Sequence, residues 1–196
     1  MFKNPFFSLL FLVLMWGINW PINKIGLSYT SPANYVELRF LVGTVTMFII
    51  AAVSKNLILP RLRDLPIILT VGIFQMGLLI ILSNYGLYLI GAGKAAFLIF
   101  TTSIWIIPLS LFFGEKMNWL GGLSLVLGIA GAVLLVGPWH PGKENEWLGD
   151  SLLLLSSFSW AIGILCARHM KWHRPPIQLL PWQLLLATIC TTLYAY

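Results

Sequence analysis

The chain has 196 residues, of which 59% are hydrophobic and only 9% charged, and its mean hydropathy is +0.88. Soluble domains carry roughly 25% charged residues, so this chain has too little polar surface to cover a water-soluble globule. The net charge of +6 would suit a nucleic-acid-binding protein, but the basic residues fall mainly in the gaps between apolar runs, where they act as topology signals. We therefore expect a polytopic protein embedded in a lipid bilayer, with no nucleic-acid partner.

Seven apolar runs follow one another along the chain, each near the roughly 20 residues that a helix needs to cross a bilayer. They cover residues 5–26, 33–53, 65–90, 92–113, 119–137, 147–169 and 177–196. The predicted fold class is an all-α polytopic membrane protein. The first run contains Trp16 and Trp20 and no small-residue cleavage pattern, which predicts a retained span and not a signal peptide.

Basic residues in the gaps predict how these spans are oriented. If the N-terminus is cytoplasmic, eight Lys and Arg residues of the gaps fall inside and three fall outside. Cytoplasmic loops carry the excess of Lys and Arg in membrane proteins. We therefore expect an integral protein of the cell (inner) membrane with its N-terminus in the cytoplasm.

The chain also contains an internal repeat. A shift of 144 positions lays Trp16 on Trp160, Lys24 on Arg168 and Pro32 on Pro176 without a gap. Five predicted spans lie between the start of the first copy and the start of the second, and because five is odd the second copy enters the membrane from the opposite side. Many secondary transporters are built from such inverted repeats.

The repeat predicts the domain organisation. Residues 1–137 form a first repeat of five helices, residues 138–147 an outside loop, and residues 148–196 the first two helices of a second repeat. Two complete copies would make about ten spans, so we expect the chain to be one complete half and part of the other. A natural seven-span protein is the alternative.

Polar and aromatic residues on the first two runs are candidates for a substrate cavity. Trp16 and Asn19 share one helical face, and asparagine is unfavourable against lipid unless it is hydrogen-bonded. Pro21 removes an intrahelical hydrogen bond and should kink this helix. On the second run, Arg39 is predicted to reach the cavity or a gate, with snorkelling to the surface as the alternative. Glu37, about 200° around the helix from it, is a candidate proton-coupling carboxylate.

Later runs supply further candidates for substrate binding, namely Asn84, Tyr88, Thr101, Trp105 and Trp160. The first two are four residues apart and therefore share a helical face, although a tyrosine near a helix end is also typical of a membrane-interface belt. The aromatic stripe in 92–113 contains Pro108, which should kink that helix. Such a stripe also suits plain packing.

The fifth run is predicted to serve helix packing. Ser124, Gly128 and Ala132 recur every four residues, a spacing that lets helix backbones approach closely. Histidines and cysteines lack metal-ligand spacing, and the sequence has no catalytic serine motif and no phosphate-binding glycine loop. We expect no enzyme activity, no cofactor and no metal site.

Residues 91–137 resemble part of a known family. A Gly-Lys start, an apolar helix with a late proline, then Gly114-Glu115-Lys116 and a Gly-rich helix ending in Ala-Val-Leu-Leu-Val-Gly resemble the close of the first EamA domain of the drug/metabolite transporter superfamily. The repeat shift also lays Arg39 on Gln183, in step with the Arg and Gln of the two EamA halves.

This resemblance implies an EamA-like inverted-repeat bundle. It further implies a secondary transporter that moves small organic metabolites, amino acids or related compounds, through a central cavity by alternating access, with export as the expected direction. The alternatives are a membrane-embedded enzyme acting on lipid-like substrates and a membrane assembly or scaffold protein. The sequence leaves the substrate, the proton coupling and the oligomeric state open.

Overall fold

The structure is a computed structural model that describes residues 5–136 and 145–196. Its elements in chain order are α1 (Pro5–Gly26), α2 (Pro32–Val53), η1 (Leu62–Asp64), α3 (Leu65–Thr70), η2 (Val71–Leu78), α4 (Leu79–Leu89), α5 (Ala92–Phe100), α6 (Thr102–Phe112), α7 (Trp119–Val136), α8 (Glu146–His169) and α9 (Pro176–Ala195). Six described helical stretches are long and apolar enough to cross a membrane, and a shorter apolar helix covers Trp119–Leu134. The predicted all-helical membrane architecture is confirmed at this level.

Part of the predicted organisation falls on residues that the structure does not describe. Residues 138–144 of the predicted outside loop lie outside the described residues, as do Lys3 and Lys143 of the charge count. The helix that follows begins at Glu146, one residue before the predicted run.

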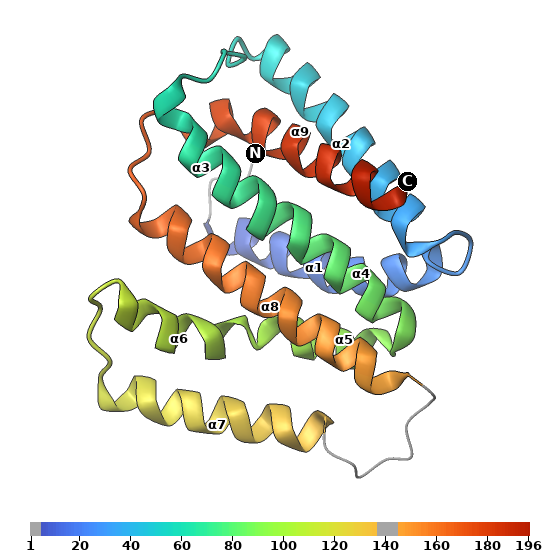
Figure 1. Ribbon diagram of the computed structural model, residues 1–196, viewed down its shortest axis with the longest axis vertical. Coiled ribbons are helices and arrows are strands. Elements are labelled where there is room, and N and C mark those ends of the chain that lie inside the picture. Colours follow the sequence, from blue (N-terminus) through green and yellow to red (C-terminus); the bar gives the residue numbers. More distant parts are fainter. Residues whose placement is uncertain (1–4, 137–144) are drawn as a thin grey trace.

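The helices run side by side, and α8 lies in the interior of the bundle (Figure 1). It packs against η2 and α4 on one side and against α5 and α6 on the other. Helix α9 packs against α2 and η2, while α7 lies at one edge of the bundle against α6. The last two helices are therefore inserted between elements of the first half of the chain.

The third span, predicted as one continuous helix, is built from several pieces. Its central element η2 is a π-helix, and such wide turns are rare and often mark functional sites. Gly72 in η2 allows close contact with α9. A Cβ added to Gly72 would lie 2.9 Å from Cδ2 of Leu186 and 3.1 Å from the carbonyl oxygen of Gln183, whereas one added to Gly77 would make an ordinary contact, 3.5 Å from Cβ of Cys190. The absence of a side chain at Gly72 thus lets α9 pack closely against this span.

The fourth span is interrupted at Thr101, between α5 and α6. The hydroxyl of Thr101 donates to the Leu98 carbonyl and that of Thr102 to the Ile99 carbonyl, both at 2.6 Å, so threonine side chains satisfy backbone acceptors near the break. Pro108, where the sequence predicts a kink, lies inside α6, and Pro21 lies inside α1. A bend at either proline stays a prediction.

Three apolar clusters hold the bundle together. One joins α4, α5 and α8 through residues such as Leu87, Leu98 and Leu153. The second joins α3, the start of η2 and α9, and the third joins α2 to α9 through Val36, Phe40 and Ala187. Because these clusters fix α4 and α5 against α8, they position the residues of the cavity described below.

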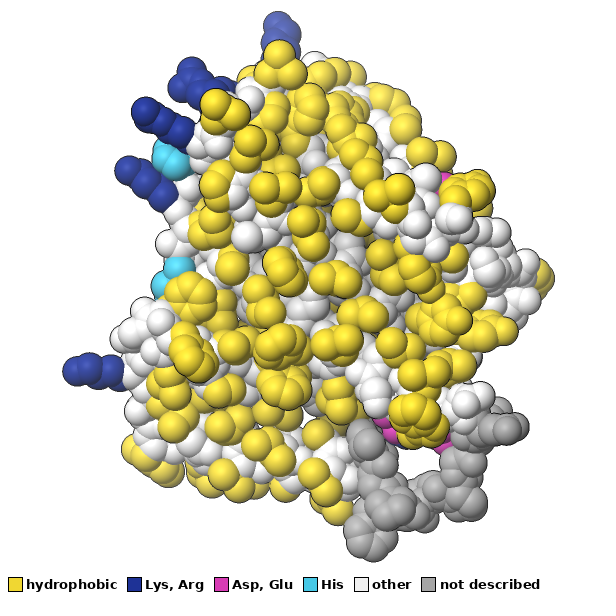
Figure 2. Space-filling model, in the orientation of Figure 1, with side chains coloured by type: hydrophobic (Ala, Val, Ile, Leu, Met, Phe, Trp, Pro, Cys, Tyr) yellow, Lys and Arg dark blue, Asp and Glu magenta, His cyan; other side chains and the backbone are white. Residues whose placement is uncertain are grey.

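Charged residues gather at the two ends of the bundle. Lys and Arg side chains project from one edge of the molecule, while apolar side chains cover most of the visible face (Figure 2). At that end Arg174 pairs with the buried Asp64 at 3.2 Å. At the opposite end Nζ of Lys94 lies 2.8 Å from Asp150 and 3.1 Å from Glu146. Ion pairs therefore link α8 and the α8–α9 turn to earlier elements at both ends.

Candidate functional site

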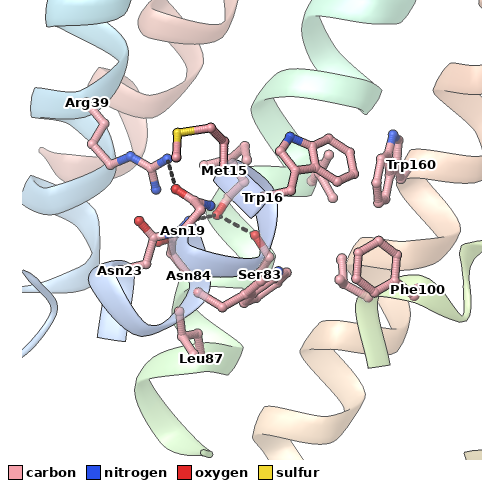
Figure 3. Close-up of a pocket in the computed structure, with 14 residues that line it drawn as sticks. Met15, Trp16, Asn19, Asn23, Arg39, Ser83, Asn84, Leu87, Phe100 and Trp160 are labelled. Atoms are coloured by element: carbon pink, nitrogen blue, oxygen red, sulfur yellow. Dashed lines mark hydrogen bonds between the residues drawn. The ribbon is translucent and has the colours of Figure 1, made fainter. Parts of the chain in front are cut away.

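A cavity of about 300 Å³ lies between α1, α2, α4, α5 and α8. Its lining consists of Met15, Trp16, Asn19, Trp20, Asn23, Arg39, Leu79, Ile80, Ser83, Asn84, Leu87, Ile99, Phe100 and Trp160. Polar side chains gather at one end of it and aromatic rings at the other (Figure 3). The cavity therefore has two chemically distinct ends.

Arg39 belongs to the polar end. Its Nη2 donates to Oδ1 of Asn19 over 3.5 Å, a long hydrogen bond that joins α2 to α1. Its guanidinium carbon lies 5.5 Å from the centre of the Tyr35 ring, within the range of a cation–π contact. The Tyr35 hydroxyl donates to Oδ1 of Asn23 at 2.9 Å. These contacts place the guanidinium of Arg39 beside α1 and in the cavity lining, while its role there stays a prediction.

The polar end also carries hydrogen-bonding atoms without partners. Nη1 of Arg39 and Oδ1 of Asn84 are both buried and have no hydrogen-bond partner within the described part of the chain. Asn84 is only 3% exposed, and its Nδ2 donates to the Ile80 carbonyl at 2.9 Å. Buried polar groups are normally satisfied, so a free donor and a free acceptor beside one cavity indicate a place for a polar ligand or water.

Three aromatic rings form the other end. The centroids of Trp16 and Trp160 are 5.4 Å apart, and those of Phe100 lie 6.3 Å and 6.5 Å from them respectively. Trp16 is 49% and Phe100 51% exposed, so this end of the cavity is the more open one. It offers ring faces to an apolar or aromatic group.

Several predicted substrate-binding residues lie elsewhere. Trp105 donates from Nε1 to the Ser157 hydroxyl at 3.0 Å, and the hydroxyl of Thr101 lies 3.0 Å from the same oxygen. These contacts tie the fourth span to α8. Thr101 also borders a second, mainly apolar hollow of about 230 Å³. Tyr88 is 50% exposed and does not line the larger cavity.

The remaining predicted residues are placed as follows. Glu37 is half-buried on α2, is absent from the cavity lining, and forms no ion pair within the described residues. On α7, Ser124 and Gly128 border the second hollow, and a Cβ added to Gly128 would lie 2.9 Å from Cγ1 of Ile104. Ala132 is half-buried on the same helix. The structure thus places α7 as a helix that packs closely at one glycine.

Some lining residues were not predicted. Phe100 directly precedes the break in the fourth span, and a break changes which residues share a face with those beyond it. Ser83 lies beside Asn84 and, like it, donates to the Ile80 carbonyl. The signal that could have found Ser83 is its position next to a predicted polar residue on an otherwise apolar helix.

Membrane-length helices around a cavity lined by an arginine, buried amides and aromatic rings are typical of the class of membrane transporters. The chain belongs to the EamA-like transporter family, which matches residues 5–137. The sequence-based recognition of this family is confirmed.

Relatives agree with this assignment. The chain is 32% identical over 162 residues to the uncharacterized transporter YvbV of Bacillus subtilis (strain 168), with 79% of the chain and 50% of the relative covered. It is 30% identical over 187 residues to a probable amino-acid metabolite efflux pump of Escherichia coli (strain K12), with 92% and 60% covered. The chain thus spans about half the length of YvbV and 60% of that of the pump. No solved structure matches it.

Proposed function

We propose that the protein is a secondary transporter that moves small organic metabolites, amino acids or related compounds, across the cell (inner) membrane by alternating access, with export as the direction. Membership of the EamA-like transporter family supports transport as such. Relatives from Escherichia coli and Salmonella typhimurium that are named probable amino-acid metabolite efflux pumps support the substrate class and the direction. A relative from Escherichia coli named an inner membrane transporter supports the location.

The observation that carries the proposal is a pair of contacts between residues that the repeat makes equivalent. Trp16 contacts Trp160, with ring centroids 5.4 Å apart, and the shift between them is the 144 positions of the repeat. The hydroxyls of Thr44 and Thr188, separated by the same 144 positions, lie 2.7 Å apart. When two units are related by a twofold axis, a residue that touches its own equivalent lies on that axis.

The position of these contacts supports an axis in the plane of the membrane. Each of the four residues lies well inside its helix, away from both ends. A twofold axis that crosses the middle of membrane-spanning helices relates units of opposite topology, as in inverted-repeat transporters, whose substrate sites lie near the midplane. Trp16 and Trp160 also line the cavity, so the cavity would lie beside the proposed axis.

We propose the predicted repeats for this chain: a first repeat at 1–137 and the start of a second at 148–196. The basic edge in Figure 2 lies at the end of the bundle where Figure 1 places the α8–α9 turn and the start of α1. This supports a cytoplasmic position for that end, and therefore a cytoplasmic N-terminus.

Transport is tested by reconstituting the native product in liposomes and measuring the flux of a panel of radiolabelled amino acids. We expect flux in wild type and at least a roughly tenfold loss in Trp16→Ala and in Asn19→Ala, at unchanged membrane abundance, because both side chains line the cavity. Trp147→Ala is the matched control, since Trp147 is 69% exposed on α8. Unchanged flux in both cavity variants would remove these residues from the site, and no flux of any solute would refute the transport proposal.

A further inference from the structure

We infer that the cavity selects solutes through a carboxylate, which Arg39 binds, and that it discriminates against organic cations. The inference rests on the proposed function, because it describes the substrate of the same site. It goes beyond the family and the named relatives in stating which charge the solute must carry and which residue recognises that charge.

The described lining of the cavity carries a net positive charge. Arg39 is the cation of the lining, and none of the described lining residues is Asp or Glu. Arg39 forms no ion pair within the described part of the chain. Glu37, two positions away, faces about 200° around the helix and does not line the cavity. An unpaired charge at membrane depth is unfavourable, and an anionic group on the solute would compensate for it.

Arg39 also retains hydrogen-bonding capacity for a ligand. A guanidinium has five N–H donors in a planar fork that matches a carboxylate. Nη1 has no partner among the described residues, and the bond from Nη2 to Asn19 is long at 3.5 Å. A carboxylate could therefore be bound without breaking a strong existing contact.

The rest of the cavity offers a hydrogen-bond acceptor and apolar ring faces to a solute. Oδ1 of Asn84 is a buried acceptor without a partner in the described chain, suited to an N–H group such as an ammonium. The rings of Trp16, Phe100 and Trp160 lie at the other end of the cavity (Figure 3), suited to an apolar side chain. A carboxylate, a donor and an apolar group on one small solute describe an amino acid with an apolar side chain.

A preference of the cavity for organic cations would also have a physical basis. Aromatic faces also attract organic cations, so the ring cluster alone would admit amines. The unpaired charge of Arg39 opposes this, since like charges in a low-dielectric site repel strongly. The ratio of carboxylate to amine binding therefore tests the inference directly.

The experiment measures equilibrium binding to the purified native product and does not depend on flux. The probes are three acid–amide pairs: L-leucine with L-leucinamide, L-methionine with L-methioninamide, and L-phenylalanine with L-phenylalaninamide. Each pair shares a side chain and differs in whether the carboxylate is present. We expect at least one acid to bind and to do so about tenfold or more tightly than its amide, the range of a hydrogen-bonded charge pair.

Variants assign this preference to Arg39. Arg39→Gln should abolish the acid preference and Arg39→Lys should keep part of it, while Arg63→Gln, at an exposed residue of η1, should leave the ratio unchanged. Asn84→Asp adds a carboxylate to the cavity and should shift the ratio of acid to amide binding toward the amides. If Arg39→Gln fails to fold, this variant tests whether the charge of the cavity sets that ratio.

The outcomes are distinguishable. Equal binding of acids and amides, no binding of any acid, or an acid preference that survives in Arg39→Gln would overturn the inference. Acid-selective binding without flux of any solute would refute the proposed transport and leave the binding inference standing.

Discussion

Gly86 on α4 and Gly149 on α8 lie where the backbones of these two helices come close together. A Cβ added to Gly86 would lie 2.7 Å from Cγ of Leu153 and 2.9 Å from the carbonyl oxygen of Gly149. Leu153 is fully buried, and a backbone oxygen cannot rotate away. The substitution Gly86→Ala should therefore push α4 and α8 apart.

The loss of stability in Gly86→Ala is measured against Gly43→Ala, a substitution at a glycine in open space. Overpacking by one methyl group destabilises a protein by about 1–3 kcal/mol, and contact with backbone favours the upper part, about 2–3 kcal/mol. Alanine also has a higher helix propensity than glycine, by about 1 kcal/mol. Gly43→Ala on α2 gains this propensity without a clash, because nothing lies within 4 Å of its added Cβ.

The assay is thermal unfolding of the two detergent-solubilised variants. We expect the Tm of Gly86→Ala to fall below that of Gly43→Ala by about 4–12 °C, because 1 kcal/mol corresponds to about 2–4 °C for a chain of this size. Equal Tm values would refute the reasoning, since they would mean that the α4 and α8 backbones do not meet at Gly86.

Two further interactions can be tested by the same measurement. Thr44→Val and Thr188→Val each remove one hydroxyl of the 2.7 Å pair, so a double-mutant cycle should give a coupling of about 0.6 kcal/mol; additive effects would contradict the contact. Asp150→Asn should lower stability by about 1–3 kcal/mol, because Asp150 is buried and lies 2.8 Å from Lys94. Glu146→Gln is the control with a more exposed carboxylate, and an equal or larger loss there would contradict the ranking.

Helix positions are predicted well where length and hydropathy alone decide them. The predicted run 5–26 coincides with α1, and 33–53 begins one residue inside α2. The π-helical turns of η2 and the break at Thr101 were not predicted. Both depend on neighbours, since η2 packs against α9 and the hydroxyl of Thr101 contacts Ser157 on α8. Apolar periodicity within one segment contains no information about these partners.

In the candidate site, too, the sequence predicts features within one helix but not contacts between helices. The predicted residues that the structure brings to the cavity are Trp16, Asn19, Arg39, Asn84 and Trp160. Spacing along a helix shows which residues share a face, and polar faces of membrane helices turn away from lipid. Spacing does not show which neighbour a face meets, which is why Trp105 lies against Ser157 and Tyr88 lies outside the cavity. The roles of all these residues in binding stay predictions.

The ammonium group of Lys24 at the end of α1 has a consequence for how that helix can move. It donates to three carbonyl oxygens at the end of the third span, those of Leu87, Tyr88 and Ile90, at 2.6, 2.9 and 2.7 Å. Sliding or rolling α1 by one turn would strand all three acceptors and separate the cation from the negative pole of α4. Helix α1 is therefore tethered at this end, and we expect any larger displacement of α1 to occur at its opposite end, near Phe6.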